Sequence, residues 1–125
     1  MYCKSMLPVA YQQIFQTFGL RLNELQQAAT HANPEATSLH SHFLVVQQFF
    51  QHQIMALDDT VLETVERSRI QAYCTEINKQ MRLLGMDVAF LQAARQPVTA
   101  QQRQAQIRDR IARLIDYCKA VLSQE

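Results

Sequence analysis

The chain has 125 residues and is 48% hydrophobic, which suffices for one buried core without help from disulfides or a metal. It contains only two glycines and three prolines, too few for a β-rich protein, which needs turn residues roughly every eight to twelve positions. The formal net charge of +1 excludes a strong overall field, and the composition favours a single all-α domain spanning residues 1–125.

The first two predicted helices follow from apolar residues that recur every three or four positions. The first helix runs from about residue 7 to 31, and the residues before Pro34 should end it. The second runs from about residue 38 to 56, with Thr37 or Ser38 as its N-terminal cap. We expect the second helix to be the most buried, because its apolar stripe is widened by Leu44, Val45 and Phe49.

The third predicted helix, about residues 60–96, is the longest. Its inward side chains recur at an average spacing of 3.5 residues, the period of helical bundles, and they are Ile70, Tyr73, Ile77, Met81, Leu84, Val88 and Leu91. Because the neighbouring helices are shorter, residues 60–69 form either a separate short helix or a projecting end. Gly85 costs about 1 kcal/mol relative to alanine inside a helix, so we expect a close helix crossing there.

The fourth predicted helix runs from about residue 100 to 123. Pro97 stops the third helix, and Thr99 with Gln102 matches a capping box for the fourth. Short connections make consecutive helices antiparallel neighbours. The expected fold is therefore an up-down-up-down antiparallel four-helix bundle with a long third helix.

The cysteines and the hydropathy pattern predict the cellular compartment. Cys3, Cys74 and Cys118 form no CxxC pair and are odd in number, so we expect free thiols, the latter two as small buried hydrophobes. The N-terminal residues lack the apolar core of a secretory signal, and no run of eighteen apolar residues occurs. These features predict a cytoplasmic protein that does not enter membranes.

Motifs for enzymatic or cofactor chemistry are missing from the sequence. No glutamate has a histidine three residues later, neither HExxH nor CxxCH occurs, and two glycines are too few for a phosphate-binding loop. His40 and His42 point to opposite sides of a helix, so they could not chelate one metal ion. We interpret these two, with His31 and His52, as surface or helix-end histidines, and we expect no enzyme, no cofactor and no metal.

Charge is distributed unevenly along the chain. Residues 1–66 carry two basic and six acidic side chains, whereas residues 67–125 carry ten basic and five acidic ones. Complementary charge between neighbouring helices is one explanation. The functional alternative is a nucleic-acid-associated helical protein whose basic second half contacts phosphates, although balanced total charge and the lack of a helix-turn-helix pattern argue against it.

Four segments of the chain are distinctive: TEINKQMRLL at 75–84, residues 87–96, DYC at 116–118 and VQQFF at 46–50. In these segments, and over about residues 44–122, the chain resembles the cyanobacterial heterocyst frequency control protein PatD family. The resemblance implies a small cytoplasmic helical protein of cyanobacteria. It also implies a role in controlling how often heterocysts form, and binding to the division protein FtsZ with modulation of its assembly. It implies no catalytic residues.

Helical geometry places candidate partner-binding residues opposite the inward stripe of the third helix. There Lys79, Arg82 and Met86 combine charge, which steers encounter, with an apolar centre, which supplies affinity. A rival surface for an acidic protein partner lies on the fourth helix, around Arg103, Arg110 and Arg113. The plain alternative is solvated surface, with Asp87 paired to a basic side chain of another helix. Homodimerisation through the overhang of the third helix is left open.

Overall fold

The computed structural model describes residues 7–30 and 36–123. Within these ranges the chain forms α-helices and short helical segments, without a β-strand. The α-helices are α1 (Val9–Ala29), α2 (Ala36–Phe49), α3 (Thr64–Ala93) and α4 (Pro97–Leu122); a π-helix, η1 (Phe50–Ile54), and a 3-10 helix, η2 (Asp59–Val61), lie between α2 and α3.

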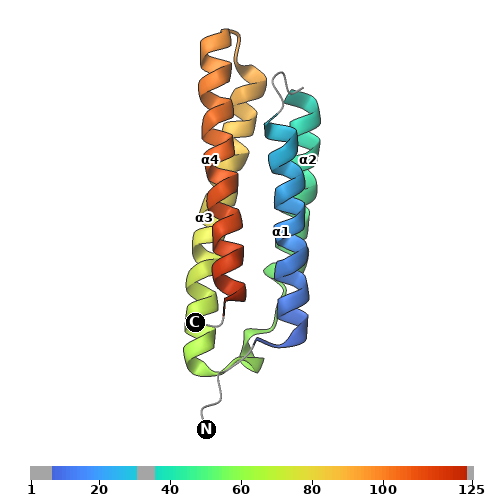
Figure 1. Ribbon diagram of the computed structural model, residues 1–125, viewed down its shortest axis with the longest axis vertical. Helices are drawn as coiled ribbons and strands as arrows, with labels where there is room; N and C mark the ends of the chain where they lie inside the picture. Colours follow the sequence, from blue (N-terminus) through green and yellow to red (C-terminus); the bar gives the residue numbers. More distant parts are fainter. Residues whose placement is uncertain (1–6, 31–35, 124–125) are drawn as a thin grey trace.

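The helices form a ring in which each one packs against the helices before and after it, and α4 closes the ring on α1 (Figure 1). Consecutive helices run in opposite directions, as Figure 1 shows. The α1–α4 and α3–α4 interfaces are the most extensive, and the α2–α3 interface is smaller. The prediction of an up-down-up-down four-helix bundle is confirmed, and α3, with 30 residues, is its longest helix.

The core consists of one apolar stripe from each helix, which the ring turns inward. Phe18 of α1 is fully buried and packs against the rings of Phe49, at the end of α2, and Phe50, at the start of η1, with ring centroids 6.1 Å and 5.8 Å away. Further side chains of the core with at most 1% exposure are Phe15, Leu22, Leu25, Ala29, Leu39, Ile77, Leu84, Val88, Ile107, Ile111, Leu114 and Val121. The described helices include none that is both long and apolar enough to cross a membrane.

The expectation that α2 is the most buried helix is wrong. Leu44 and Val45 are exposed, and Phe49 is only partly buried. The reason is the ring itself: α2 contacts α1 and α3, so the side of α2 that faces away from both remains uncovered. The predicted N-terminal caps of the second helix are also wrong, because Thr37 and Ser38 lie inside α2 as the structure describes it.

The connection between α2 and α3 is more elaborate than a single long third helix. The Asp58 carboxylate accepts hydrogen bonds from the backbone N–H and the hydroxyl of Thr60, which closes the turn η2. Arg67 then donates to the carbonyl oxygens of Asp59 and Leu62, at 3.0 Å each. These bonds satisfy backbone acceptors ahead of α3, which begins at Thr64. A separate short helix is therefore present only as the 3-10 helix η2, and residues 64–69, which the sequence also offered to that short helix, are the first turns of α3.

The fourth helix begins three residues earlier than predicted, at Pro97. Proline needs no N–H acceptor and has a helical φ, so it is well suited to a first helical position. Thr99 therefore lies within the first turn, and the helix has no side-chain cap at its N-terminus. The predicted capping box of Thr99 and Gln102 is wrong.

The first turns of α3 extend beyond the end of α4 in Figure 1, and a second projecting end lies at the tip of the α3–α4 hairpin. Figure 1 shows this tip extending beyond the ends of α1 and α2. The α1 helix ends at the level of Gln104, whose side-chain amide donates to the carbonyl oxygen of Ala29 at 2.9 Å. The first turns of α4 and the last turns of α3 therefore support each other without α1.

Gly85 marks the predicted close crossing, which lies between α3 and α2. A Cβ atom placed on Gly85 would lie 3.1 Å from Cζ of Phe43, closer than ordinary van der Waals contact. A Cβ atom on Gly19, by contrast, would make only an ordinary van der Waals contact, 4.0 Å from Cβ of Cys118. The two glycines provide a matched comparison of helix propensity with and without steric conflict.

We expect Gly19→Ala to raise the free energy of unfolding by about 0.5–1 kcal/mol, the propensity difference between the two residues. Gly85→Ala should gain clearly less or lose stability, because the Phe43 ring has to move. In a Phe43→Leu background the Gly85→Ala substitution should recover its propensity gain. Urea unfolding of the four variants measures this, and equal stabilisation at both glycines in the native background would contradict the crossing argument.

Candidate functional site

The outward side of α3 carries the three predicted residues together. Lys79, Arg82 and Met86 follow one another at spacings of three and four, so they share one helix face, and all three are exposed. Met86 is 52% exposed even though it is apolar. The structure thus places the predicted α3 residues on one solvent-facing surface.

Phe90 extends this surface by one turn and was not predicted from the sequence. Its ring is 46% exposed, and the guanidinium carbon of Arg103 lies 4.6 Å from the ring centroid, a cation–π contact. The repeat of 79, 82, 86 and 90 at helical spacing could have revealed it. We call Lys79, Arg82, Met86 and Phe90 the basic–apolar ridge.

Arg110 does not belong to an exposed surface, contrary to the sequence prediction. Its Nε donates to Oδ2 of Asp87, and its Nη1 donates to Oε1 of Gln80 at 3.2 Å. The Asp87 side chain is 5% exposed and that of Arg110 is 18% exposed. The α3–α4 contact removes the Asp87 carboxylate from water. Because an uncompensated buried charge is strongly destabilising, Arg110 pairs with this carboxylate and is itself partly buried.

The remaining two arginines predicted on α4 have different roles. Nη1 of Arg103 lies 3.4 Å from Oδ1 of Asp87, so the Arg103 guanidinium contacts both this carboxylate and the ring of Phe90. Arg113 is exposed, one turn beyond Arg110. The structure therefore brings Arg103 to the ridge, assigns Arg110 to the helix interface and leaves Arg113 in solvent. Pairing of Asp87 with another helix is confirmed.

A polar seam along the α3–α4 interface contains this cluster. Tyr73, Gln80 and Asp87 are seven residues apart on α3, and Arg103, Arg110 and Tyr117 are seven apart on α4. At one end of the seam the rings of Tyr73 and Tyr117 are in contact, with centroids 6.0 Å apart. At the other end Asp87 pairs with the two arginines. The shared seven-residue spacing is the sequence signal that identifies these partners.

We expect Asp87→Ala to lower the free energy of unfolding by about 3 kcal/mol, because Arg110 loses the anion that compensates its partly buried charge. Arg113→Ala, on the same helix but in solvent, should change it by less than about 0.5 kcal/mol. The Asp87→Leu/Arg110→Leu double variant should recover part of the loss. A small effect of Asp87→Ala in denaturant unfolding would show that the cluster is well solvated.

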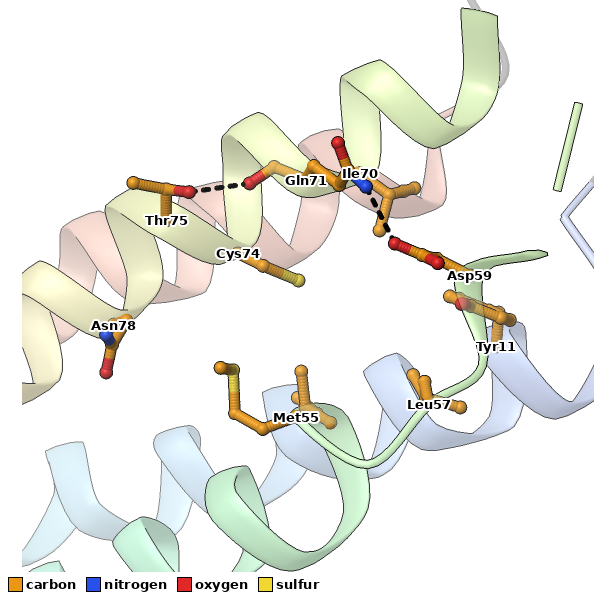
Figure 2. Close-up of a pocket in the computed structure, with 10 residues that line it drawn as sticks. Tyr11, Met55, Leu57, Asp59, Ile70, Gln71, Cys74, Thr75 and Asn78 are labelled. Carbon is orange, nitrogen blue, oxygen red and sulfur yellow. Dashed lines mark hydrogen bonds between the residues drawn. The ribbon is translucent and has the colours of Figure 1, made fainter. Parts of the chain in front are cut away.

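A hollow lies beside the first half of α3, between this helix, α1 and the chain after η1 (Figure 2). Its volume is about 420 Å³. Cys74 projects into it from α3, Met55 lies opposite, and Tyr11 and Asp59 lie together at one end, as Figure 2 shows. Ile54, the last residue of the π-helix, contributes to the apolar wall, so the irregular end of α2 helps to form the cavity.

The thiols in and near this cavity are protected from ionisation. Burial, with a smaller contribution from the Asp59 carboxylate, raises the pKa of Cys74 to about 11. Burial raises the pKa of Cys118, which lies in the core, to about 12. Cys118 is buried as predicted and Cys74 is half-buried, and both are free thiols. Cys3 lies outside the described residues.

These raised pKa values predict a loss of stability at alkaline pH. The folded state holds the thiol protons more tightly than the unfolded state, so the stabilisation is complete below about pH 9 and is lost as pH rises toward 11. We expect the free energy of unfolding to fall by up to about 1.4 kcal/mol per pH unit for each thiol. Urea unfolding at about pH 8, 9 and 10 measures this, and the Cys74→Ala/Cys118→Ala variant should show a smaller fall.

The histidines do not gather into a site. The ring of His42 forms a 2.8 Å hydrogen bond through Nδ1 with the carbonyl oxygen of Ser38, within its own helix. Nδ1 of His40 is buried without a partner in the described residues, and His52 is exposed. His31 lies outside the described residues. Over residues 7–30 and 36–123, no group of three histidine, cysteine or acidic side chains is placed to hold a metal ion.

Comparison with known proteins assigns no family to this arrangement. No protein-family model matches the chain. Comparison with curated proteins gives no match, and neither does comparison with solved structures. The resemblance to the PatD family therefore remains a prediction from the sequence segments, and the candidate sites stand on their geometry.

Proposed function

We propose that this chain is a non-enzymatic regulatory module that binds another protein through the basic–apolar ridge. The observation that carries the proposal is the exposure of Met86 and Phe90, 52% and 46%, on a helix whose inward stripe is fully used in the core. Half-exposed apolar side chains of this size gain about 25 cal/mol for each Å² that a partner covers. They are the natural anchors of an interface.

The charges around these anchors define the chemistry of the partner. Lys79 and Arg82 are exposed on the ridge, and Arg103 lies over Phe90 from α4. A partner that presents carboxylates around an apolar side chain would satisfy both features, because the charges accelerate encounter and the apolar contact sustains the complex. Oppositely charged groups at the rim of an interface mainly determine specificity and association rate.

The partner that we propose is FtsZ, in the cytoplasm of a cyanobacterium, with a consequent effect on cell division and heterocyst frequency. This part of the proposal is supported by the resemblance over about residues 44–122, which includes the whole ridge. Two other occupants of the surface are tested with it. One is a second copy of the chain, and the other is nucleic acid bound by the basic half.

We expect Lys79→Glu/Arg82→Glu to weaken binding to purified FtsZ by about tenfold or more, and Met86→Ser/Phe90→Ser to do the same. The matched control is Arg21→Glu on α1, an exposed arginine on the helix diagonally across the bundle from α3. Cosedimentation with FtsZ filaments and biolayer interferometry give the affinities. Thermal unfolding should differ little among the variants, because all the changed side chains are exposed.

The outcomes separate the parts of the proposal. Equal affinity of the ridge variants and the native chain would overturn the surface, and failure of the native chain to bind FtsZ would overturn the partner. A mass that increases with concentration in light scattering, and is lost in the ridge variants, would identify a second copy as the occupant. Retention on heparin that falls steeply with salt would favour nucleic acid instead.

A further inference from the structure

The cavity beside Cys74 has the size and lining of a small-molecule site. Its volume of about 420 Å³ falls within the range of known ligand pockets, about 300–1,000 Å³. Its walls come from three separate parts of the chain: the start of α1, the segment after η1, and the first half of α3. Its α3 lining extends from Ile70 to Asn78 and ends before the basic–apolar ridge begins at Lys79, so the inference uses no side chain of the ridge and does not rest on the proposed function.

One end of this cavity contains a negative charge, and no cationic side chain is among the described residues that line the cavity. Asp59 is the sole charged residue among the described side chains that line the cavity. Its Oδ2 accepts a hydrogen bond from Nε2 of Gln71 at 2.7 Å, and Oδ1 has no hydrogen-bond partner within the described part of the chain. Arg67 contacts the backbone carbonyl of Asp59 rather than its carboxylate. The carboxylate is thus held in position with acceptor capacity to spare.

A buried tyrosine lies at the same end. Tyr11 is only 3% exposed and lines the cavity beside Asp59 (Figure 2). Its hydroxyl forms no hydrogen bond with any described residue. The hydroxyl oxygen is not one of the buried side-chain atoms that lack a partner, which in the described residues are Gln26 Oε1 and His40 Nδ1, so solvent reaches it. It can therefore form a hydrogen bond with a polar group of a bound molecule.

The rest of the cavity is apolar and chemically unreactive. Ile54, Leu57 and Ile70 provide aliphatic walls, and Met55 provides a flexible thioether at the mouth, where it is exposed. The Cys74 thiol points into the same space in Figure 2. It stays protonated at neutral pH because its pKa is raised to about 11, so it serves as wall rather than as nucleophile.

We infer that this cavity binds a small organic amine with an apolar body, with its ammonium group at Asp59 and Tyr11 and its apolar body along Met55 and Cys74. The carboxylate accepts a charge-assisted hydrogen bond, and the Tyr11 hydroxyl gains the partner that the protein does not supply. A neutral or anionic molecule of the same shape would fill the apolar part but would leave the Asp59 charge unmatched. Charge therefore decides which ligands are accepted.

Three probes with the same number of carbon atoms test this inference on the full-length chain: 4-phenylbutylamine, 4-phenylbutan-1-ol and 4-phenylbutyrate. Titration followed by ¹⁵N–¹H correlation spectra should shift the amides of Tyr11, Asp59 and Cys74 with the amine. The amine should bind about tenfold more tightly than the alcohol, and the carboxylate more weakly still. The amides of Met86 and Phe90, the ridge residues farther along α3 from the cavity, should remain unshifted.

Variants locate the effect. Asp59→Asn keeps an acceptor for Gln71 but removes the charge, so it should lower the affinity for the amine about tenfold and leave that for the alcohol unchanged. Asp109→Asn, an exposed carboxylate on α4, is the matched control and should bind like the native chain. Cys74→Leu extends into the cavity and should abolish all binding while the protein stays folded.

Either of two results would overturn the inference. One is the absence of amide shifts around the cavity with every probe. The other is equal affinity for amine and carboxylate, with no change in Asp59→Asn. Thermal unfolding of each variant accompanies the titrations, and a variant that fails to fold is replaced by the comparison of the three probes on the native chain, which tests the charge preference without any substitution.

Discussion

The carboxylate of Asp87 sets the geometry of the α3–α4 hairpin. It is almost wholly removed from water, so the folded state has to place cations against it, and the chain does so with Arg110 and Arg103, seven residues apart on α4. A shift of α4 along α3 by one turn would leave the Asp87 carboxylate buried without its cations, at a cost of about 3–5 kcal/mol. We therefore expect the polar seam to disfavour other registers of this helix pair.

That register determines what remains on the surface. With Arg110 committed to Asp87 and Gln80, the basic character of α4 is reduced on the side where the sequence places it. Arg103 lies over the ring of Phe90, which remains half-exposed. The basic–apolar ridge is thus built largely from α3, with one cation from α4. Its composition follows from a buried ion pair that the ridge itself does not contain.

The contact between α3 and α2 depends on a glycine rather than on a buried charge. At Gly85 the helices approach so closely that a Cβ atom would meet the Phe43 ring. Towards the start of α3, α2 has given way to the π-helix and an irregular segment, and the hollow beside Cys74 lies there. An irregular segment packs against α3 less regularly than a helix does, which leaves room for the hollow.

The sequence by itself determined the helical class, the antiparallel ring, the close crossing at Gly85 and the exposure of Lys79, Arg82 and Met86, because these follow from local periodicity and from short connections. Tertiary structure alone decided the burial of Arg110, the exposure of Leu44 and Val45, the position of the projecting tip and the cavity at Tyr11 and Asp59. Each of these depends on which neighbour covers a given face and how far that neighbour extends. Helical spacing gives a side chain its direction, but only the packed partner decides whether water or protein lies there.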